Sequence, residues 1–205
     1  MKKVSKKNNK QHIALISLIS FILFLIISVL VSYNFFTQID KNINIFVSKS
    51  TNQGFVQFNF IIGEIFSYFF ITLLVLMILY SLIKKDKKII FFSFALLLIY
   101  IILEIIKFTF GRIRPENIFE ISYSYPSRHT VLSIVLVGFL VYLFLNKMHD
   151  WKKPILLVSI SLMMIVSISR IFAGVHWFSD VFGGVAFGIF SLFFSIFIYE
   201  KMSRI

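Results

Sequence analysis

The chain has 205 residues, of which 59% are hydrophobic. A water-soluble domain of this size needs a more polar surface, so the composition excludes a water-soluble domain. It indicates that part of the apolar surface faces the lipid of a membrane. The net charge of +12 does not indicate nucleic acid, because the basic residues lie between apolar runs, and the absence of cysteine excludes disulfides, thiolate metal sites and cysteine nucleophiles.

Six apolar runs approach the length of about 20 residues that a membrane-spanning helix needs. They lie near 13–33, 58–83, 88–108, 128–146, 154–172 and 179–199. The first run exceeds the usual apolar region of a signal peptide and lacks a small-residue cleavage site, so we expect a retained anchor. Together the runs predict an all-α fold, a six-transmembrane-helix bundle that forms a single integral membrane domain over residues 1–205.

Lysine and arginine are unevenly distributed between the two ends of these runs. Fourteen of them fall in the two terminal tails and in the loops near 84–88 and 147–153, whereas seven fall on the opposite side. Positive charge marks the cytoplasmic side of membrane proteins. The distribution therefore predicts a multi-pass protein of the cell membrane with both termini in the cytoplasm.

The segment 35–55, between the first two runs, mixes apolar residues such as Ile43 and Phe46 with polar ones such as Asp40 and Asn44. This pattern favours an amphipathic helix at the outer membrane surface over a long polar loop.

Ionisable side chains are concentrated at the outer ends of the later runs, where burial is costly unless they face a cavity or a partner. They fall in three segments, KFTFGRIRP at 107–115, YPSRHT at 125–130 and SRIFAGVHWFSD at 169–180. Because the topology brings all three segments to the same side of the bilayer, we expect one extracytoplasmic site there.

The cationic residues of these segments suit a phosphate group. Lys107, Arg114 and Arg170 supply positive charge and several hydrogen-bond donors for phosphoryl oxygens. Ser127 follows a proline where a helix would begin, so its hydroxyl and nearby main-chain N–H groups would point at an anion.

Two histidines can divide the work of phosphoryl transfer between a nucleophile and an acid/base. Asp180 lies four residues after His176. If the last helix starts there, the two share a helix face, and the carboxylate can fix the imidazole tautomer. The remaining histidine of the three segments is His129. The sequence offers no second acidic cluster for magnesium or calcium, so we expect no metal and no other cofactor.

The spacing of these residues resembles the three-motif signature of the type 2 phosphatidic acid phosphatase superfamily, which includes membrane lipid phosphatases, bacterial acid phosphatases and vanadium haloperoxidases. Lys107 is followed by six residues and Arg114-Pro115. The second motif is Pro126-Ser127-x-His129. In the third, five residues separate Ser169-Arg170 from His176, and three residues separate His176 from Asp180. The resemblance covers about residues 58–199.

This resemblance implies a role for each motif position. His176 corresponds to the nucleophile that forms a phosphohistidine, with Asp180 as its orienting partner. His129 corresponds to the general acid that protonates the leaving oxygen and then activates water. The phosphate ligands would be Lys107, Arg114, Ser127, the main-chain amide of residue 128 and Arg170.

Arg128 departs from the family pattern, which usually has glycine at this position. If the position required positive φ, arginine would cost about 1 kcal/mol or more. Its guanidinium either contacts a second phosphate, which would favour diphosphate substrates, or points to lipid headgroups.

Three further ionisable residues in or near the motifs have less definite expectations. Arg112 lies between two motif positions and contacts phosphate, stabilises its loop or meets lipid headgroups. Glu104 is one helical turn before Lys107, which suggests an ion pair that positions the lysine. Glu64 lies in an apolar run without a sequence-local partner and has no assigned role.

We therefore expect a metal-independent lipid phosphatase that hydrolyses a lipid monophosphate or diphosphate. The resemblance makes undecaprenyl diphosphate, a carrier of cell-wall sugars, the leading substrate. Phosphatidylglycerol phosphate, phosphatidate and lipid A phosphate are the alternatives. A lipid phosphotransferase using the same phosphohistidine and a non-catalytic lipid-binding protein are rival classes. The expected partners are the bilayer and its lipid phosphates, not nucleic acid.

Overall fold

The computed structural model describes residues 2–115, 122–144 and 151–203, and in this part of the chain every regular element is a helix. The elements are α1 (Lys2–Ser32), α2 (Thr37–Ser50), α3 (Gln53–Lys84), α4 (Lys87–Phe110), α5 (Arg128–Phe144), α6 (Lys152–Phe172) and α7 (Phe178–Met202). The expected all-α fold is confirmed.

Five of these helices, α1, α3, α4, α6 and α7, are long and apolar enough to cross a membrane. The remaining expected span, 128–146, corresponds to α5, which is apolar but 17 residues long within the described residues. Residues 145 and 146 of that span lie outside the described part, as does Lys147 of the following loop. The count of six membrane spans therefore stays a prediction.

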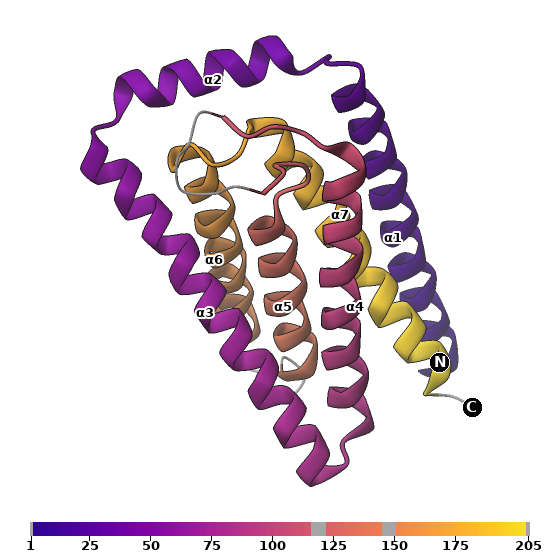
Figure 1. Ribbon diagram of the computed structural model, residues 1–205. Helices are drawn as coiled ribbons and strands as arrows, with labels where there is room; N and C mark the ends of the chain where they lie inside the picture. The colour runs from indigo at the N-terminus through magenta and orange to yellow at the C-terminus, as the bar shows by residue number, and fades with distance from the viewer. Residues whose placement is uncertain (1, 116–121, 145–150, 204–205) are drawn as a thin grey trace.

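Helix α2 falls within the segment 35–55 for which an amphipathic helix was predicted. It runs across one end of the bundle and joins α1 to α3, while the two chain termini lie toward the opposite end (Figure 1). Its two buried residues are Val47 and Asp40, whereas Phe46 is largely exposed. One edge of α2 is therefore packed on the bundle.

Helix α5 forms the centre of the bundle and contacts α3, α4, α6 and α7, while α1 packs along α7 (Figure 1). Val131, Val135 and Phe139 of α5 are fully buried. In contrast, large apolar side chains on the outer helices are exposed, among them Leu18, Ile65 and Phe94. A bundle whose outer surface is this apolar is stable when lipid covers it.

The end of α4 is set by Gly111, which has a left-handed φ of +56° and donates its N–H to the carbonyl of Lys107 at 3.0 Å. Glycine adopts this conformation without the steric cost of a side chain. The turn places Lys107 in the last turn of α4 and directs the following residues across the end of the bundle that α2 covers.

Candidate active site

The three predicted segments meet at one end of the bundle. The N–H of Ser127, just before α5, donates to the carbonyl of Asp180 in the first turn of α7 at 3.0 Å. The N–H of Ser124 donates to the carbonyl of Arg112 at 2.8 Å, and that of His176 to the carbonyl of Arg170 at 3.3 Å. These main-chain contacts link residues that are up to 53 positions apart in the sequence.

His176 lies in the loop between α6 and α7 with both ring nitrogens close to charged partners. Its Nδ1 is 3.4 Å from Oδ2 of Asp180, and its Nε2 is 3.2 Å from Nη1 of Arg114. A carboxylate accepts only, so Nδ1 carries the proton and the lone pair is at Nε2. Burial, reinforced by the positive charges of Arg114 and Lys107, lowers the pKa of His176 well below its usual value. The ring is therefore a neutral imidazole whose Nε2 faces a guanidinium.

Arg114 is fixed by its loop as well as by His176. Its Nη1 donates to the carbonyl of Val175 at 2.6 Å, and its Nε donates to the carbonyl of Ser122 at 2.6 Å. These two main-chain carbonyls hold the guanidinium on the Nε2 side of His176. An anion that approached Nε2 would meet this cation first.

Asp180 both caps the start of α7 and contacts His176. One carboxylate oxygen, Oδ2, accepts the N–H of Trp177 at 2.9 Å and faces His176, while Oδ1 accepts from Nη1 of Arg112 at 2.5 Å. Of the roles considered for Arg112, stabilisation of the loop agrees best with the structure, because the guanidinium lies against the carboxylates of Asp40 and Asp180.

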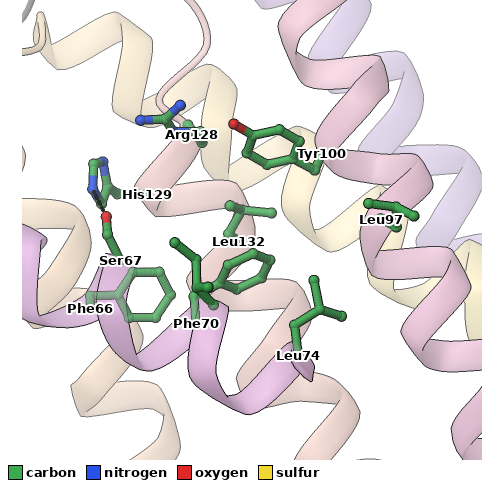
Figure 2. Close-up of a pocket in the computed structure, with 10 residues that line it drawn as sticks. Phe66, Ser67, Phe70, Leu74, Leu97, Tyr100, Arg128, His129 and Leu132 are labelled. Carbon is green, nitrogen blue, oxygen red and sulfur yellow. Dashed lines mark hydrogen bonds between the residues drawn. The ribbon is translucent and has the colours of Figure 1, made fainter. Parts of the chain in front are cut away.

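His129 is the second residue of α5 and is nearly fully buried. Its Nε2 is 2.9 Å from Oγ of Ser67 on α3, and among the described residues its Nδ1 has no hydrogen-bond partner. Figure 2 shows the ring beside a pocket between α3, α4 and α5, lined mainly by apolar side chains such as Phe70, Leu97 and Leu132. The pocket has a volume of about 260 Å³.

Arg128 lies at the polar rim of the same pocket, beside His129 (Figure 2). Its Nη1 donates to Oε1 of Glu104 at 3.2 Å, so Glu104 and Arg128 form an ion pair. The ion pair expected between Glu104 and Lys107 stays a prediction. The described non-glycine residues with positive φ are Asn34 and Lys85. The strain considered for arginine at position 128 is therefore absent.

Arg170, in the last turn of α6, is fully buried against α3. Its Nη2 donates to the α3 carbonyls of Asn59 at 2.5 Å and Phe60 at 3.0 Å. The guanidinium fits there because residue 63 is glycine: an added Cβ would lie 2.0 Å from the guanidinium carbon. Gly63 therefore makes room for a proposed phosphate ligand.

Lys107 and Ser127 are also buried at this end. Ser127 directly precedes α5, and its Oγ accepts from the hydroxyl of Thr130 at 3.0 Å. The N–H groups in the first turn of a helix have no intrahelical acceptors and attract anions. The amide of residue 128, the first of α5, is one of these groups.

Three residues of this region were missed by the sequence analysis: Ser67, Gly63 and the buried Asp40 of α2. The charge of Asp40 within a mixed segment was a visible but weak signal, and nothing marked the other two. Glu64 is half-buried and keeps no assigned role. Within the described ranges, no three His, Cys, Asp or Glu side chains are grouped so that they could hold a metal ion.

Comparison with known proteins identifies related sequences. A family model described as the PAP2 superfamily matches residues 88–204. Over 86 residues the chain is 38% identical to the bacitracin transport permease protein BcrC of Bacillus licheniformis, and over 107 residues it is 27% identical to phosphatidylglycerophosphatase B of Bacillus subtilis. These matches cover 42% and 49% of the chain, but only 38% and 53% of the respective relatives.

Two crystal structures share the fold. A transmembrane PAP2 type phosphatidylglycerolphosphate phosphatase from Bacillus subtilis superposes with a TM-score of 0.80 at 21% identity, over 92% of this chain and 98% of that one. LpxE of Aquifex aeolicus superposes with a TM-score of 0.56 at 22% identity, over 78% and 93%. The likeness in fold to the first of these structures covers nearly the whole chain, beyond the residues 88–204 that the family model matches.

Proposed function

Because the chain belongs to the PAP2 superfamily and is a multi-pass membrane protein, we propose that it is a lipid phosphate phosphatase whose nucleophile is His176. The leading substrate is undecaprenyl diphosphate, as the resemblance of this chain to membrane lipid phosphatases suggests. The observation that carries the proposal is the position of His176, with Asp180 at one ring nitrogen and the Arg114 guanidinium at the other.

The reaction follows from that position. Nε2 of His176 attacks phosphorus in line, the bond from phosphorus to the leaving oxygen breaks, and the product is a phosphohistidine. Asp180 stabilises the positive charge that develops on the ring through Nδ1–H. Arg114, with Lys107, Ser127, the amide of residue 128 and Arg170, neutralises the charge on the phosphoryl oxygens. Water then hydrolyses the phosphohistidine and releases inorganic phosphate.

His129 supplies the proton for the leaving oxygen. Its Nε2 is fixed by the Ser67 hydroxyl, so Nδ1 is the atom left to exchange a proton with the substrate and then with water. Its place on the wall of the apolar pocket supports a lipid substrate, because an acyl or prenyl chain there would bring its phosphate toward the ring (Figure 2).

Arg128 supports a diphosphate over a monophosphate. It follows Ser127 directly and is about one-third exposed at the pocket rim, so its guanidinium can exchange Glu104 for a second phosphate. Phosphatidylglycerol phosphate, phosphatidate and lipid A phosphate remain the alternatives. The names of the Bacillus subtilis phosphatases favour the first of these.

The decisive assay measures phosphate release by the purified protein from a panel of these lipids, with and without a metal chelator. We expect release that the chelator leaves unchanged, and none from His176→Ala. His12→Gln is the matched control, since His12 is an exposed histidine of α1. Strong loss of activity with chelator contradicts the metal-free mechanism, and a phosphorylated lipid acceptor in place of free phosphate identifies a transferase.

The covalent intermediate has its own test. Brief reaction with lipid carrying a ³²P label, followed by alkaline quenching, should leave label on the protein that acid removes. Label on His176→Ala under the same conditions assigns the nucleophile to another residue.

We place the termini in the cytoplasm and the site outside it, in a single six-span domain of the cell membrane. The chain has no cysteine, so single-cysteine variants report topology without background. In intact cells a membrane-impermeant maleimide should label Lys41→Cys on α2 and not Lys85→Cys between α3 and α4. The reverse pattern inverts the assignment.

A further inference from the structure

The buried carboxylate of Asp40 links the surface helix α2 to the start of α7. Asp40 is 2% exposed. Its Oδ1 accepts the main-chain N–H of Ser179 at 2.9 Å, and its Oδ2 accepts the Ser179 hydroxyl at 2.6 Å. Asp40 and Ser179 are 139 residues apart in the sequence, so the contact exists only in the folded chain.

Arg112 extends this link to the proposed catalytic pair. Its Nη2 is 2.6 Å from Oδ2 of Asp40, and its Nη1 is 2.5 Å from Oδ1 of Asp180. A planar guanidinium presents its donors in a fixed geometry, so the position of one carboxylate constrains the other. The other oxygen of Asp180 faces Nδ1 of His176.

We propose that Asp40 and Arg112 are positioning residues that act on His176 through Asp180. The inference rests on the proposed role of His176 as the nucleophile. It makes α2 part of the apparatus that orients the imidazole, in addition to covering this end of the bundle.

The charges explain why Asp40 would matter at a distance. Arg112 is shared between two carboxylates, which leaves Asp180 with negative charge for the imidazole. Without Asp40, Asp180 is the one carboxylate left to the guanidinium among those it contacts here. Nη1 keeps its contact with the Ser179 hydroxyl at 2.8 Å, but Nη2 loses the carboxylate that holds its side of the plane. Because the contact between Asp180 and His176 is already 3.4 Å long, a small displacement of the carboxylate removes it.

The test compares Asp40→Asn, Asp40→Glu and the control Lys41→Gln, which removes an exposed charge from the adjacent position of α2. Asp40→Asn should lower kcat roughly tenfold and leave KM within about twofold, the scale of one charge-assisted hydrogen bond. Asp40→Glu should restore part of the loss, and Lys41→Gln should behave as the parent. A rise in KM with kcat unchanged, or a fall in kcat no larger than that of Lys41→Gln, overturns the proposal.

A double-mutant cycle tests whether the effect passes through Arg112. If Asp40 acts through it, Asp40→Asn combined with Arg112→Ala should be no slower than Arg112→Ala alone. Losses that multiply would show that Asp40 acts independently and would overturn the relay.

An NMR measurement separates this inference from the proposed function. The chain has four histidines, so a ¹⁵N-histidine spectrum is small, and loss of one signal in His176→Gln assigns that residue. Asp40→Asn should shift the Nδ1 resonance of His176, whereas Lys41→Gln should not. A parent protein inactive on every lipid refutes the phosphatase but leaves this measurement valid, and an unmoved resonance refutes the relay.

Discussion

Replacing Gly63 with alanine should inactivate the protein without unfolding it. In the folded protein the Arg170 guanidinium lies directly over Gly63 and donates to the carbonyls one helical turn before it, those of Asn59 and Phe60. An alanine Cβ would lie 2.0 Å from the guanidinium carbon and 2.1 Å from two of its nitrogens. The side chain of Arg170 must therefore move.

The size of the effect follows from these distances. Contacts to a Cβ are ordinarily at least 3.4 Å long, so the guanidinium must shift by more than 1 Å. A misplacement of about 1 Å in a group that positions substrate costs about 100-fold in rate. Two weakened charge-assisted hydrogen bonds cost about 1.5 kcal/mol each, whereas alanine in a helix gains up to about 1 kcal/mol over glycine. The net destabilisation of about 2 kcal/mol leaves the bundle folded.

The assay is phosphate release by purified Gly63→Ala, together with its thermal unfolding in detergent. We expect kcat/KM to fall about 100-fold while the melting temperature falls by only a few degrees. Gly54→Ala is the matched control on the same helix, since the nearest atom to its added Cβ, Oδ1 of Asn52, is 3.4 Å away. It should retain activity within about twofold.

Two results would refute this reasoning. Activity of Gly63→Ala within threefold of the parent would show that the position of Arg170 does not limit the reaction. A loss that adds to that of Arg170→Ala in the double variant would show that Gly63 acts by another route.

Three further predictions follow from single contacts. Tyr125→Phe removes the buried hydrogen bond to Ser28, 2.8 Å long, and should cost about 1 kcal/mol, seen as a lower melting temperature; Ser28→Ala should cost the same and the double variant no more. Arg128→Gly should lower the ratio of diphosphate to monophosphate turnover about tenfold, and Glu104→Gln, which releases Arg128, should raise this ratio. An unchanged ratio in both variants would show that the guanidinium does not bind the second phosphate. Burial and the charge of Arg114 lower the pKa of His176 in the folded protein, so below about pH 6.5 the unfolded chain binds a proton that the folded chain does not. The free energy of unfolding should therefore fall as the pH drops through that value, and it should fall less in His176→Gln. Equal pH dependence of thermal unfolding in both proteins would contradict this.

Much of the candidate site could be predicted because its chemistry is carried by scarce residues. In a chain that is 59% hydrophobic, a lysine, two arginines and two histidines at helix ends stand out, and their spacing matches one family. The structure places Arg114 and Asp180 on opposite sides of His176, an arrangement consistent with the roles expected for them. It also places Glu104 against Arg128, a pairing that the sequence did not suggest, because the side chain of residue 128 reaches the α4 surface from the start of α5.

Other residues could not be predicted because their importance comes only from contacts between distant helices. Gly63 is one small residue in a long apolar helix, and its role depends on where α6 places Arg170. Ser67 matters because its hydroxyl reaches His129 from α3. Asp40 was visible only as a charge in an amphipathic segment, and its burial depends on how α2 crosses the end of the bundle (Figure 1).

By itself, the sequence determined that the chain forms apolar helices for a membrane, that its cations and histidines fall at their ends, and which family it belongs to. These properties are local, since they depend on composition, hydrophobic run length and spacing along the chain. The tertiary structure decided which carboxylate pairs with which cation, which glycine makes room for Arg170, and that α2 contributes a buried charge. Such choices depend on helix packing, where distances of a few ångströms separate a hydrogen bond from no contact.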